Sequence, residues 1–194
     1  MIEEVKSLVG RTPGLALAYF YCENKSKNTQ ILSNLIGSLV KQLCAVSAEA
    51  YNDLLASYTT CHGDYRSANS PKSSDLRALL LRASRYFDTV LIIVDGIDEC
   101  EDAAERASIL DFLSTVNSPQ SGTIKIACTS RDEVDIRNSF AKFTSISIAA
   151  RGTDLELFVS ATIEMRTRDR SLRIRDPLLR EEIINKIVAK ANGM

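Results

Sequence analysis

Short apolar runs alternate with longer amphipathic stretches along this chain. The runs at residues 15–22 and 90–94 are continuous and rich in aromatic or β-branched side chains, which is typical of strands buried on both faces. A third strand is predicted at residues 124–128. Residues 143–148 alternate apolar and polar side chains, so they predict a fourth strand nearer to an edge of the sheet.

The stretches between these runs carry helical periodicity. Over residues 31–44 apolar side chains recur at i, i+4 and i+8, which predicts an amphipathic helix of about four turns lying on the sheet. Further helices are predicted at residues 2–9, 51–58, 75–87, 103–116, 154–165 and 177–191. Strands separated by helices predict an α/β fold with a mostly parallel sheet flanked by helices.

The composition of the chain argues against several classes of function. The chain has 194 residues, enough for one well-buried domain, with 24 Lys and Arg against 25 Asp and Glu. This balance argues against a dedicated nucleic-acid binder. No signal-peptide pattern and no apolar run of bilayer-spanning length is present, so we expect a cytoplasmic protein without a membrane partner. The five cysteines lack C-x-x-C spacing and are predicted to be reduced.

Two weaker signals favour structural interpretations. Cys61 and His62 are adjacent, as in half of a zinc site, but no second pair completes the pattern and His62 is the only histidine. We interpret them as loop residues. The basic run at residues 166–175 could bind phosphate or an acidic partner, but a solvated connection between helices is the favoured interpretation, because Asp169 interrupts the run.

The strongest chemical signal follows the second strand. Asp95, Gly96, Asp98 and Glu99 place three carboxylates and a flexible backbone position directly after an apolar run. In open α/β sheets, ligands bind at the carboxyl ends of the strands. Carboxylates there suit Mg²⁺, which prefers oxygen ligands and usually binds with phosphates. The alternative is an Asp-rich turn that caps a helix; the density of acids favours the phosphate–metal interpretation.

Three segments, in order, carry a family resemblance: LALAYFYC with the helix NTQILSNLIGSLVKQL, then TVLIIVDGIDEC, then IKIACTSRDEVDI. Together they resemble the NACHT-type NTPase domain of the STAND class of P-loop ATPases. They are especially similar to the nephrocystin-3-like N-terminal domain of fungal multidomain proteins with ankyrin or related repeats. The resemblance implies an NTPase core over residues 1–150 and the start of a C-terminal helical region of the same domain over 151–194.

The resemblance also implies roles for individual residues. Asp95 matches the Walker B aspartate, which holds the Mg²⁺ of bound ATP or GTP through a water. Asp98 and Glu99 match the acidic pair of which one orients the attacking water, and Arg131 matches the sensor near the γ-phosphate. The nucleotide contacts implied beside this arginine are Thr129 and Ser130.

One family motif is missing: the chain contains no G-x-x-x-x-G-K-[ST] phosphate loop. By the resemblance, residues 2–9 match the end of the helix that follows this loop. We therefore expect an NTPase fold without its first strand, which the family places between the strands at 124–128 and 143–148. We expect weak or absent nucleotide binding, no cofactor retained, no hydrolysis, and low stability because of the open strand edges.

Two alternative functions fit parts of the pattern. The chain could be a non-catalytic interaction module or relic that forms homo- or hetero-oligomers with intact relatives through its open edges. A receiver-like phospho-acceptor centred on Asp95 is disfavoured, because no early acidic pair is present and Ala149 follows the last predicted strand where a lysine would be needed.

Overall fold

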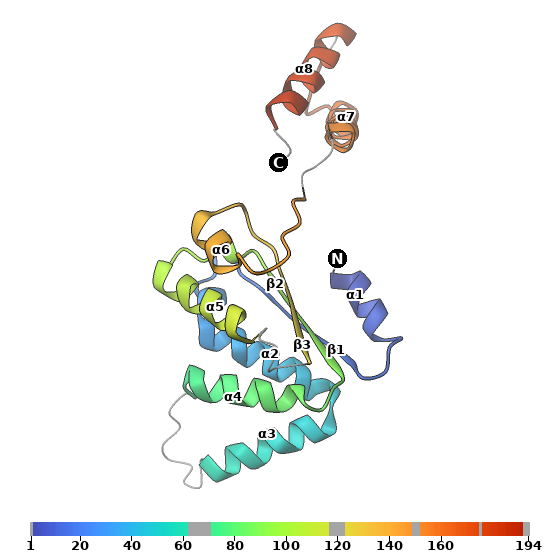
Figure 1. Cartoon of the computed structure of the whole chain (residues 1–194). Helices are drawn as coiled ribbons and strands as arrows, with labels where there is room; N and C mark the ends of the chain where they lie inside the picture. The colour runs from blue at the N-terminus through green and yellow to red at the C-terminus, as the bar shows by residue number, and fades with distance from the viewer. Residues whose placement is uncertain (1, 62–70, 117–122, 149–151, 175, 192–194) are drawn as a thin grey trace. The chain divides into compact units, whose positions relative to one another are not determined.

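The three segments predicted as strands at residues 15–22, 90–94 and 124–128 form a parallel sheet, as predicted. In the computed structural model the strands are β1 (Leu15–Tyr21), β2 (Thr89–Asp95) and β3 (Ile124–Cys128), in the order β1-β2-β3 (Figure 1). Their register pairs Ala16 with Val90 and Val90 with Ile124. Side chains alternate along a strand, so the even-numbered residues of all three strands share one face of the sheet and the odd-numbered residues share the other.

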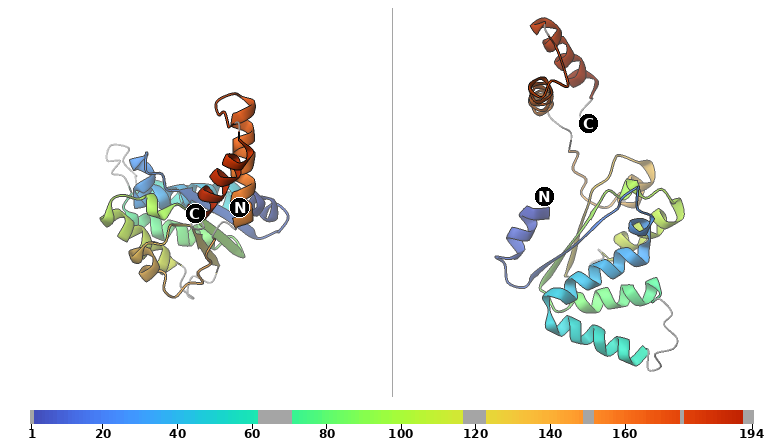
Figure 2. Two further views of the ribbon diagram at one scale, coloured as in Figure 1. Left: turned by 90° about the horizontal axis from the view of Figure 1, so that it is seen from above. Right: turned by 180° about the vertical axis from the view of Figure 1, so that it is seen from behind.

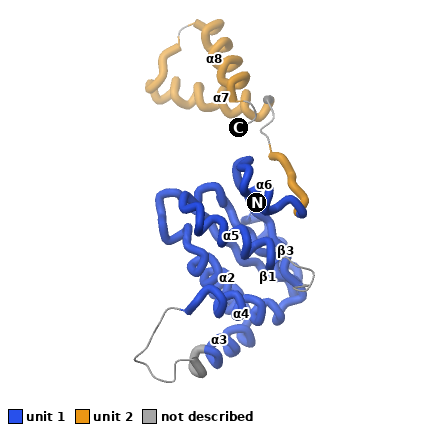
Figure 3. The backbone as a smooth tube through the Cα atoms, turned by 60° about the vertical axis from the view of Figure 1, so that its left-hand side comes forward, with its two compact units in different colours: residues 1–142 blue, residues 143–194 orange. Residues whose placement is uncertain are grey.

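The structure describes residues 2–61, 71–116, 123–148, 152–174 and 176–191, with the side chains of 58–61 and 152 excepted. The chain divides into two compact units, Met1–Lys142 and Phe143–Met194, which are coloured separately in Figure 3. His62 and the side chain of Cys61 lie outside the described residues, so the half zinc pattern stays a sequence observation. Among the described helices, none combines the length and apolarity of a bilayer-spanning segment.

Helices cover the even-numbered face of the sheet. The helices on this side of the first unit are α2 (Leu32–Val46), α3 (Ala48–Cys61), α4 (Ser73–Ser84) and α5 (Ala103–Val116) (Figures 1 and 2). Helix α2 packs on β1 and on α4, and its Leu35, Leu39 and Leu43 are completely buried. The apolar stripe predicted over residues 31–44 is therefore core. Ile92 and Phe112 of β2 and α5 are equally buried in the same cluster.

The odd-numbered face is covered differently. Helix α1 (Ile2–Val9) packs on β1 from the side of the sheet opposite α2 (Figures 1 and 2). Lys6 Nζ lies 4.8 Å from the centroid of the Tyr19 ring. On β3, by contrast, Lys125 and Ala127 are exposed on this face. The odd-numbered face is thus half-buried along most of β1 and β2, with Ile93 buried and Tyr21 exposed, and it is uncovered at β3.

Residues 143–148 form no strand, so that prediction is wrong. Residues 144–148 are irregular, and Ile146 and Ile148 are 78% and 86% exposed. Alternation is sufficient to place side chains on two sides, but a strand also needs a neighbouring strand to pair its backbone groups. No strand pairs with these residues in the described part of the chain. A short helix that the sequence did not predict, α6 (Val134–Ser139), precedes them.

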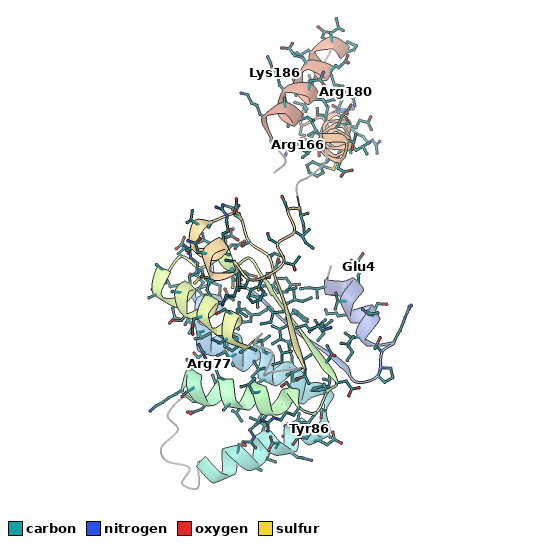
Figure 4. All side chains as sticks on the ribbon, in the orientation of Figure 1. Glu4, Arg77, Tyr86, Arg166, Arg180 and Lys186 are labelled. Carbon is teal, nitrogen blue, oxygen red and sulfur yellow. The ribbon has the colours of Figure 1, made fainter. Side chains whose placement is uncertain are left out.

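The second unit contains two helices, α7 (Gly152–Arg168) and α8 (Pro177–Lys190), which pack on each other. Val159 and Ile163 are their buried residues. Arg180 of α8 is paired with Glu164 of α7 at 3.2 Å. The basic run covers the end of α7 and the connection to α8, and its described arginines are exposed, as predicted for a solvated segment; Figure 4 shows Arg166 and Arg180 among the side chains of this unit.

Candidate functional site

The acidic residues after β2 lie where all three strands end. Asp95 is the last residue of β2, and a short 3-10 helix, η2 (Ile97–Glu99), begins two residues later. The turn between them depends on Gly96, whose φ is +73° and whose missing Cβ would lie 3.1 Å from the Cys22 carbonyl oxygen. A side chain would therefore be strained by the backbone and crowded by the end of β1.

Thr129 joins the end of β3 to the end of β2. Its hydroxyl donates to Asp95 Oδ1 and accepts from the backbone N–H of Gly96 at 3.0 Å. Its backbone N–H donates to the Val94 carbonyl at 3.0 Å, and its carbonyl accepts from the Ile97 N–H at 3.1 Å. Thr129, predicted as a nucleotide contact, thus fixes the position of Asp95 in this structure.

Asp98 joins the loop after β2 to the loop after β3. Its side chain is only 9% exposed, and Oδ1 accepts from the backbone N–H of Arg131 at 3.1 Å. Its Oδ2 lies 3.4 Å from Arg131 Nε, while the Arg131 side chain is 87% exposed. The carboxylate therefore contacts both the backbone N–H and the Nε of Arg131, while most of the side chain stays in solvent, where it can meet an anion.

Glu99 is oriented toward the third strand end. Its Oε2 accepts from the backbone N–H of Asn24, just after β1, at 3.0 Å, and the residue is exposed. Ser130, the other predicted nucleotide contact, is also exposed. Each of the three carboxylates thus connects β2 to the end of a neighbouring strand, and Glu99 is the most accessible of them.

A buried amide that sequence reasoning missed ties these loops together. Gln30 is 6% exposed, and its Nε2 donates to the carbonyls of Glu23 and Asn24, each at 3.1 Å. Its Oε1 accepts from the backbone N–H of Glu101 at 3.0 Å. Gln30 lies in the 3-10 helix η1 (Lys27–Gln30), within a polar stretch that has no periodicity to mark one residue as buried.

Replacing Gln30 by alanine should lower the free energy of unfolding by about 1–3 kcal/mol, because the Glu101 N–H and two carbonyls lose their buried partner. Asn34→Ala is the matched control. The Asn34 amide donates to the Asn28 carbonyl at 3.0 Å in an exposed position, so its loss should cost less than about 0.5 kcal/mol. Urea unfolding of both variants measures the difference. Equal losses would show that the Gln30 network does not stabilise the fold.

Arg106 fixes the chain that follows Arg131. Its Nη1 donates to Glu133 Oε2 at 2.8 Å, and its Nε lies 3.0 Å from Asp135 Oδ2 as an ion pair, without a well-directed hydrogen bond. The Arg106 side chain is 19% exposed. Helix α5 thereby anchors the segment between Arg131 and α6 at its far end, while Asp98 holds it at Arg131.

Three thiols lie under the acidic turn: Cys22, Cys100 and Cys128. Burial is the main cause that raises the pKa of the Cys22 thiol to about 12, and the nearby carboxylates of Glu99, Asp95 and Asp98 act in the same direction. Burial likewise raises the pKa of Cys128 to about 12. These thiols are therefore neutral and inert near neutral pH, as predicted for reduced, apolar cysteines.

The donor set fits a magnesium ion only in part. Within the described residues, no three His, Cys, Asp or Glu side chains converge on one point as a closed metal site. Asp95 could supply one direct or water-bridged oxygen, and waters and phosphates would complete the shell, which is how Mg²⁺ is usually held in phosphate sites. The geometry is thus compatible with metal that arrives with a phosphate ligand.

Comparison with curated proteins and with solved structures gave no match. The family model for the N-terminal region of nephrocystin 3 matches residues 1–131, which include the complete sheet and the acidic edge up to Arg131. On this evidence the chain belongs to the nephrocystin 3 N-terminal family.

Proposed function

We propose that this chain is part of a signal-transducing, nucleotide-binding switch domain of the P-loop NTPase type, in the NACHT group of STAND proteins. It carries the half of the site that would face the metal and the γ-phosphate. One observation supports this best: Asp95, Asp98, Glu99 and Arg131 meet at the carboxyl edge of a parallel sheet.

The contacts of these residues suggest a different role for each of them. Asp95, held by Thr129, would bind Mg²⁺ through a water, and the metal would neutralise phosphate charge when bound. Glu99 is exposed, so it is the better candidate to orient a water, whereas Asp98 positions Arg131. The exposed guanidinium of Arg131 would stabilise charge on a terminal phosphate.

The same reasoning predicts weak binding and no measurable turnover. The backbone of a glycine-rich loop and its lysine supply most phosphate contacts in P-loop proteins, and the sequence contains no such motif. Asp95 and Arg131 alone offer one metal contact and one cation. ATP and GTP, with Mg²⁺, are the ligands to test.

NMR titration with Mg²⁺–ATP and Mg²⁺–GTP tests the site. We expect shifts confined to residues 95–99 and 129–131, a weak affinity in the millimolar range, and no hydrolysis. Asp95→Asn should abolish the shifts, because the introduced amide keeps an oxygen for the Thr129 hydroxyl but lacks the negative charge. Asp88→Asn, an exposed residue just before the other end of β2, is the matched control and should have no effect.

Each other outcome has a definite meaning. Micromolar binding that Asp95→Asn abolishes, with or without hydrolysis, would overturn the prediction of an inactive chain. Shifts elsewhere, or unchanged binding in Asp95→Asn, would overturn the assignment of the site. No binding at all would agree with the expectation of weak or absent nucleotide binding, but it would remove the support for a nucleotide site and would favour the second candidate function.

That second candidate is a non-catalytic interaction module that pairs with intact relatives. The observation in its favour is the exposed odd-numbered face of β3, where Lys125 and Ala127 are uncovered beside the open strand edge. Stable co-purification with a full-length relative in the absence of nucleotide would support it. Failure to co-purify at high concentration would contradict it.

A further inference from the structure

The basic run between α7 and α8 has no part in the proposed function. A serine, Ser171, lies within it. In the whole sequence Ser171 is the only serine or threonine with an arginine at both the first and the third position before it. Asp169 is the one acidic residue between those two arginines. The described arginines of the run are all exposed: Arg166, Arg168, Arg170 and Arg173.

The backbone leaves helix α7 just before Ser171. The helix ends at Arg168, and Arg170 has a φ of +63°, in the left-handed region that commonly ends helices. Over residues 171–174 exposed and half-buried residues alternate, which is typical of an extended segment. Ser171 and Arg173 are the exposed residues of this segment, so the serine hydroxyl and an arginine share its solvent side.

The hydroxyl of Ser171 is accessible within its own unit. Its Oγ donates to the Arg166 carbonyl at 3.2 Å in an exposed position, and its backbone N–H donates to Asp169 Oδ1 at 2.9 Å. Water can replace the exposed hydroxyl bond, so breaking it costs little free energy. An enzyme can therefore reach this oxygen without unfolding either helix.

We propose that Ser171 is a phosphorylation site for a serine/threonine kinase that recognises arginine. The Ser171 Oγ would attack the γ-phosphorus of Mg²⁺–ATP, and the bond from that phosphorus to the β,γ-bridging oxygen would break. The hydroxyl proton would pass to a carboxylate of the kinase, and ADP would leave. Arg168 and Arg170 would pair with acidic side chains of the kinase, since kinases select their substrates partly by charge.

Other hydroxyls lack one of the two features that meet at Ser171. Thr167 lies in the same basic run, but it is helical, and its Oγ1 donates to the Ile163 carbonyl at 2.7 Å in a partly buried position. Ser147 is exposed and outside any helix, but the nearest arginine before it is Arg137, ten positions away. Accessibility and a basic surrounding therefore favour Ser171 over both.

The same arginines would interact with the product. A phosphoserine carries a charge of about −1.5 to −2 and three strong acceptor oxygens. At Ser171 this charge would lie among exposed guanidinium groups and change the segment from strongly basic to nearly neutral. The proposal stands whether or not the acidic edge binds nucleotide, since Ser171 and the carboxylates after β2 belong to different units and are tested by different variants.

Treatment of the full chain with the catalytic subunit of cyclic-AMP-dependent protein kinase, an arginine-directed enzyme, and Mg²⁺–ATP tests the site. Mass spectrometry should find about one phosphate per chain, on Ser171. Ser171→Ala should lower the initial rate by roughly tenfold or more, whereas Ser171→Thr, which keeps a hydroxyl, should still be modified. Ser147→Ala, at an exposed serine without nearby arginines, is the matched control and should leave the rate unchanged.

Arg168→Gln tests the recognition separately from the hydroxyl. It should lower kcat/KM roughly tenfold, because one charge-assisted contact with the kinase is lost while Ser171 stays in place. Circular dichroism of each variant should match that of the wild type, since both side chains are exposed. No incorporation, phosphate mainly on another residue, an unchanged rate in Ser171→Ala, or an unchanged kcat/KM in Arg168→Gln would overturn the proposal.

Discussion

Phe112→Ala is expected to lower the free energy of unfolding of the first unit by about 3–5 kcal/mol. Phe112 of α5 is completely buried in the core cluster on the even-numbered face. The Arg77 guanidinium carbon lies 5.2 Å from the centroid of its ring, so the substitution also removes a cation–π contact (Figure 4 labels Arg77 on α4). Urea unfolding followed by circular dichroism measures the loss.

The matched control is the same chemical change at an exposed position. Phe158 of α7 is 69% exposed, so Phe158→Ala should change stability by less than about 0.5 kcal/mol. The free energy of unfolding of a single domain is only about 5–15 kcal/mol, so Phe112→Ala removes a large part of the stability of the fold. A loss below about 1 kcal/mol would show that α5 does not hold the sheet as the buried contacts indicate.

The sheet could be predicted because its signal is local. The continuous apolar runs at residues 15–22 and 90–94 favour burial in the sheet, and the bounds of β3 agree with the prediction as well. The failure at residues 143–148 has the opposite cause. Pairing depends on which strand lies alongside, and the alternation of a segment contains no information about its neighbour.

The meeting of the site residues could be predicted, but their contacts could not. Parallel strands end at the same edge, so residues after β2 and after β3 had to come together. Which carboxylate is buried and which is free depends on distant partners: Asp98 accepts from Arg131 and Glu99 from Asn24. In the sequence the two form an equivalent acidic pair. In the structure Glu99 is accessible, whereas Asp98 positions Arg131.

Two amide side chains that bind backbone groups could not be predicted from the sequence, for the same reason. Gln42 lies on α2 among residues that the helical pattern assigns to a polar face, and only the fold places its amide against the Tyr19 backbone. Gln30 lies in a polar stretch between β1 and α2. A polar side chain that pairs with backbone groups leaves no period in the sequence, because its partner belongs to a different segment.

We expect the first unit to unfold at a lower alkaline pH than ionisation of its other groups alone would cause. The pKa of the Cys22 thiol rises from 9.0 to about 12 in the fold, mainly through burial, and that of Cys128 rises to about 12 for the same reason. Both thiols are protonated in the folded and unfolded chain below about pH 9, so stability there does not depend on them. Above that pH the unfolded chain loses these protons while the folded chain keeps them.

Each thiol should therefore reduce the free energy of unfolding by at most about 1.4 kcal/mol per pH unit between its unfolded and folded pKa. For two thiols the loss approaches about 5 kcal/mol by about pH 11, less to the extent that half-buried Cys128 is solvated. This loss is comparable with the entire stability of a small domain.

The double variant Cys22→Ala with Cys128→Ala isolates the thiols from the tyrosines and lysines, which also titrate at high pH. Its stability near neutral pH should be lower than that of the wild type, because two small cavities replace the sulfur atoms. Its pH dependence above about pH 9 should nevertheless be flatter, so the two curves converge. Parallel curves from chemical unfolding between about pH 7 and pH 11 would mean that both thiols ionise freely in the folded state, and hence that the acidic turn above them does not exclude water as its buried contacts imply.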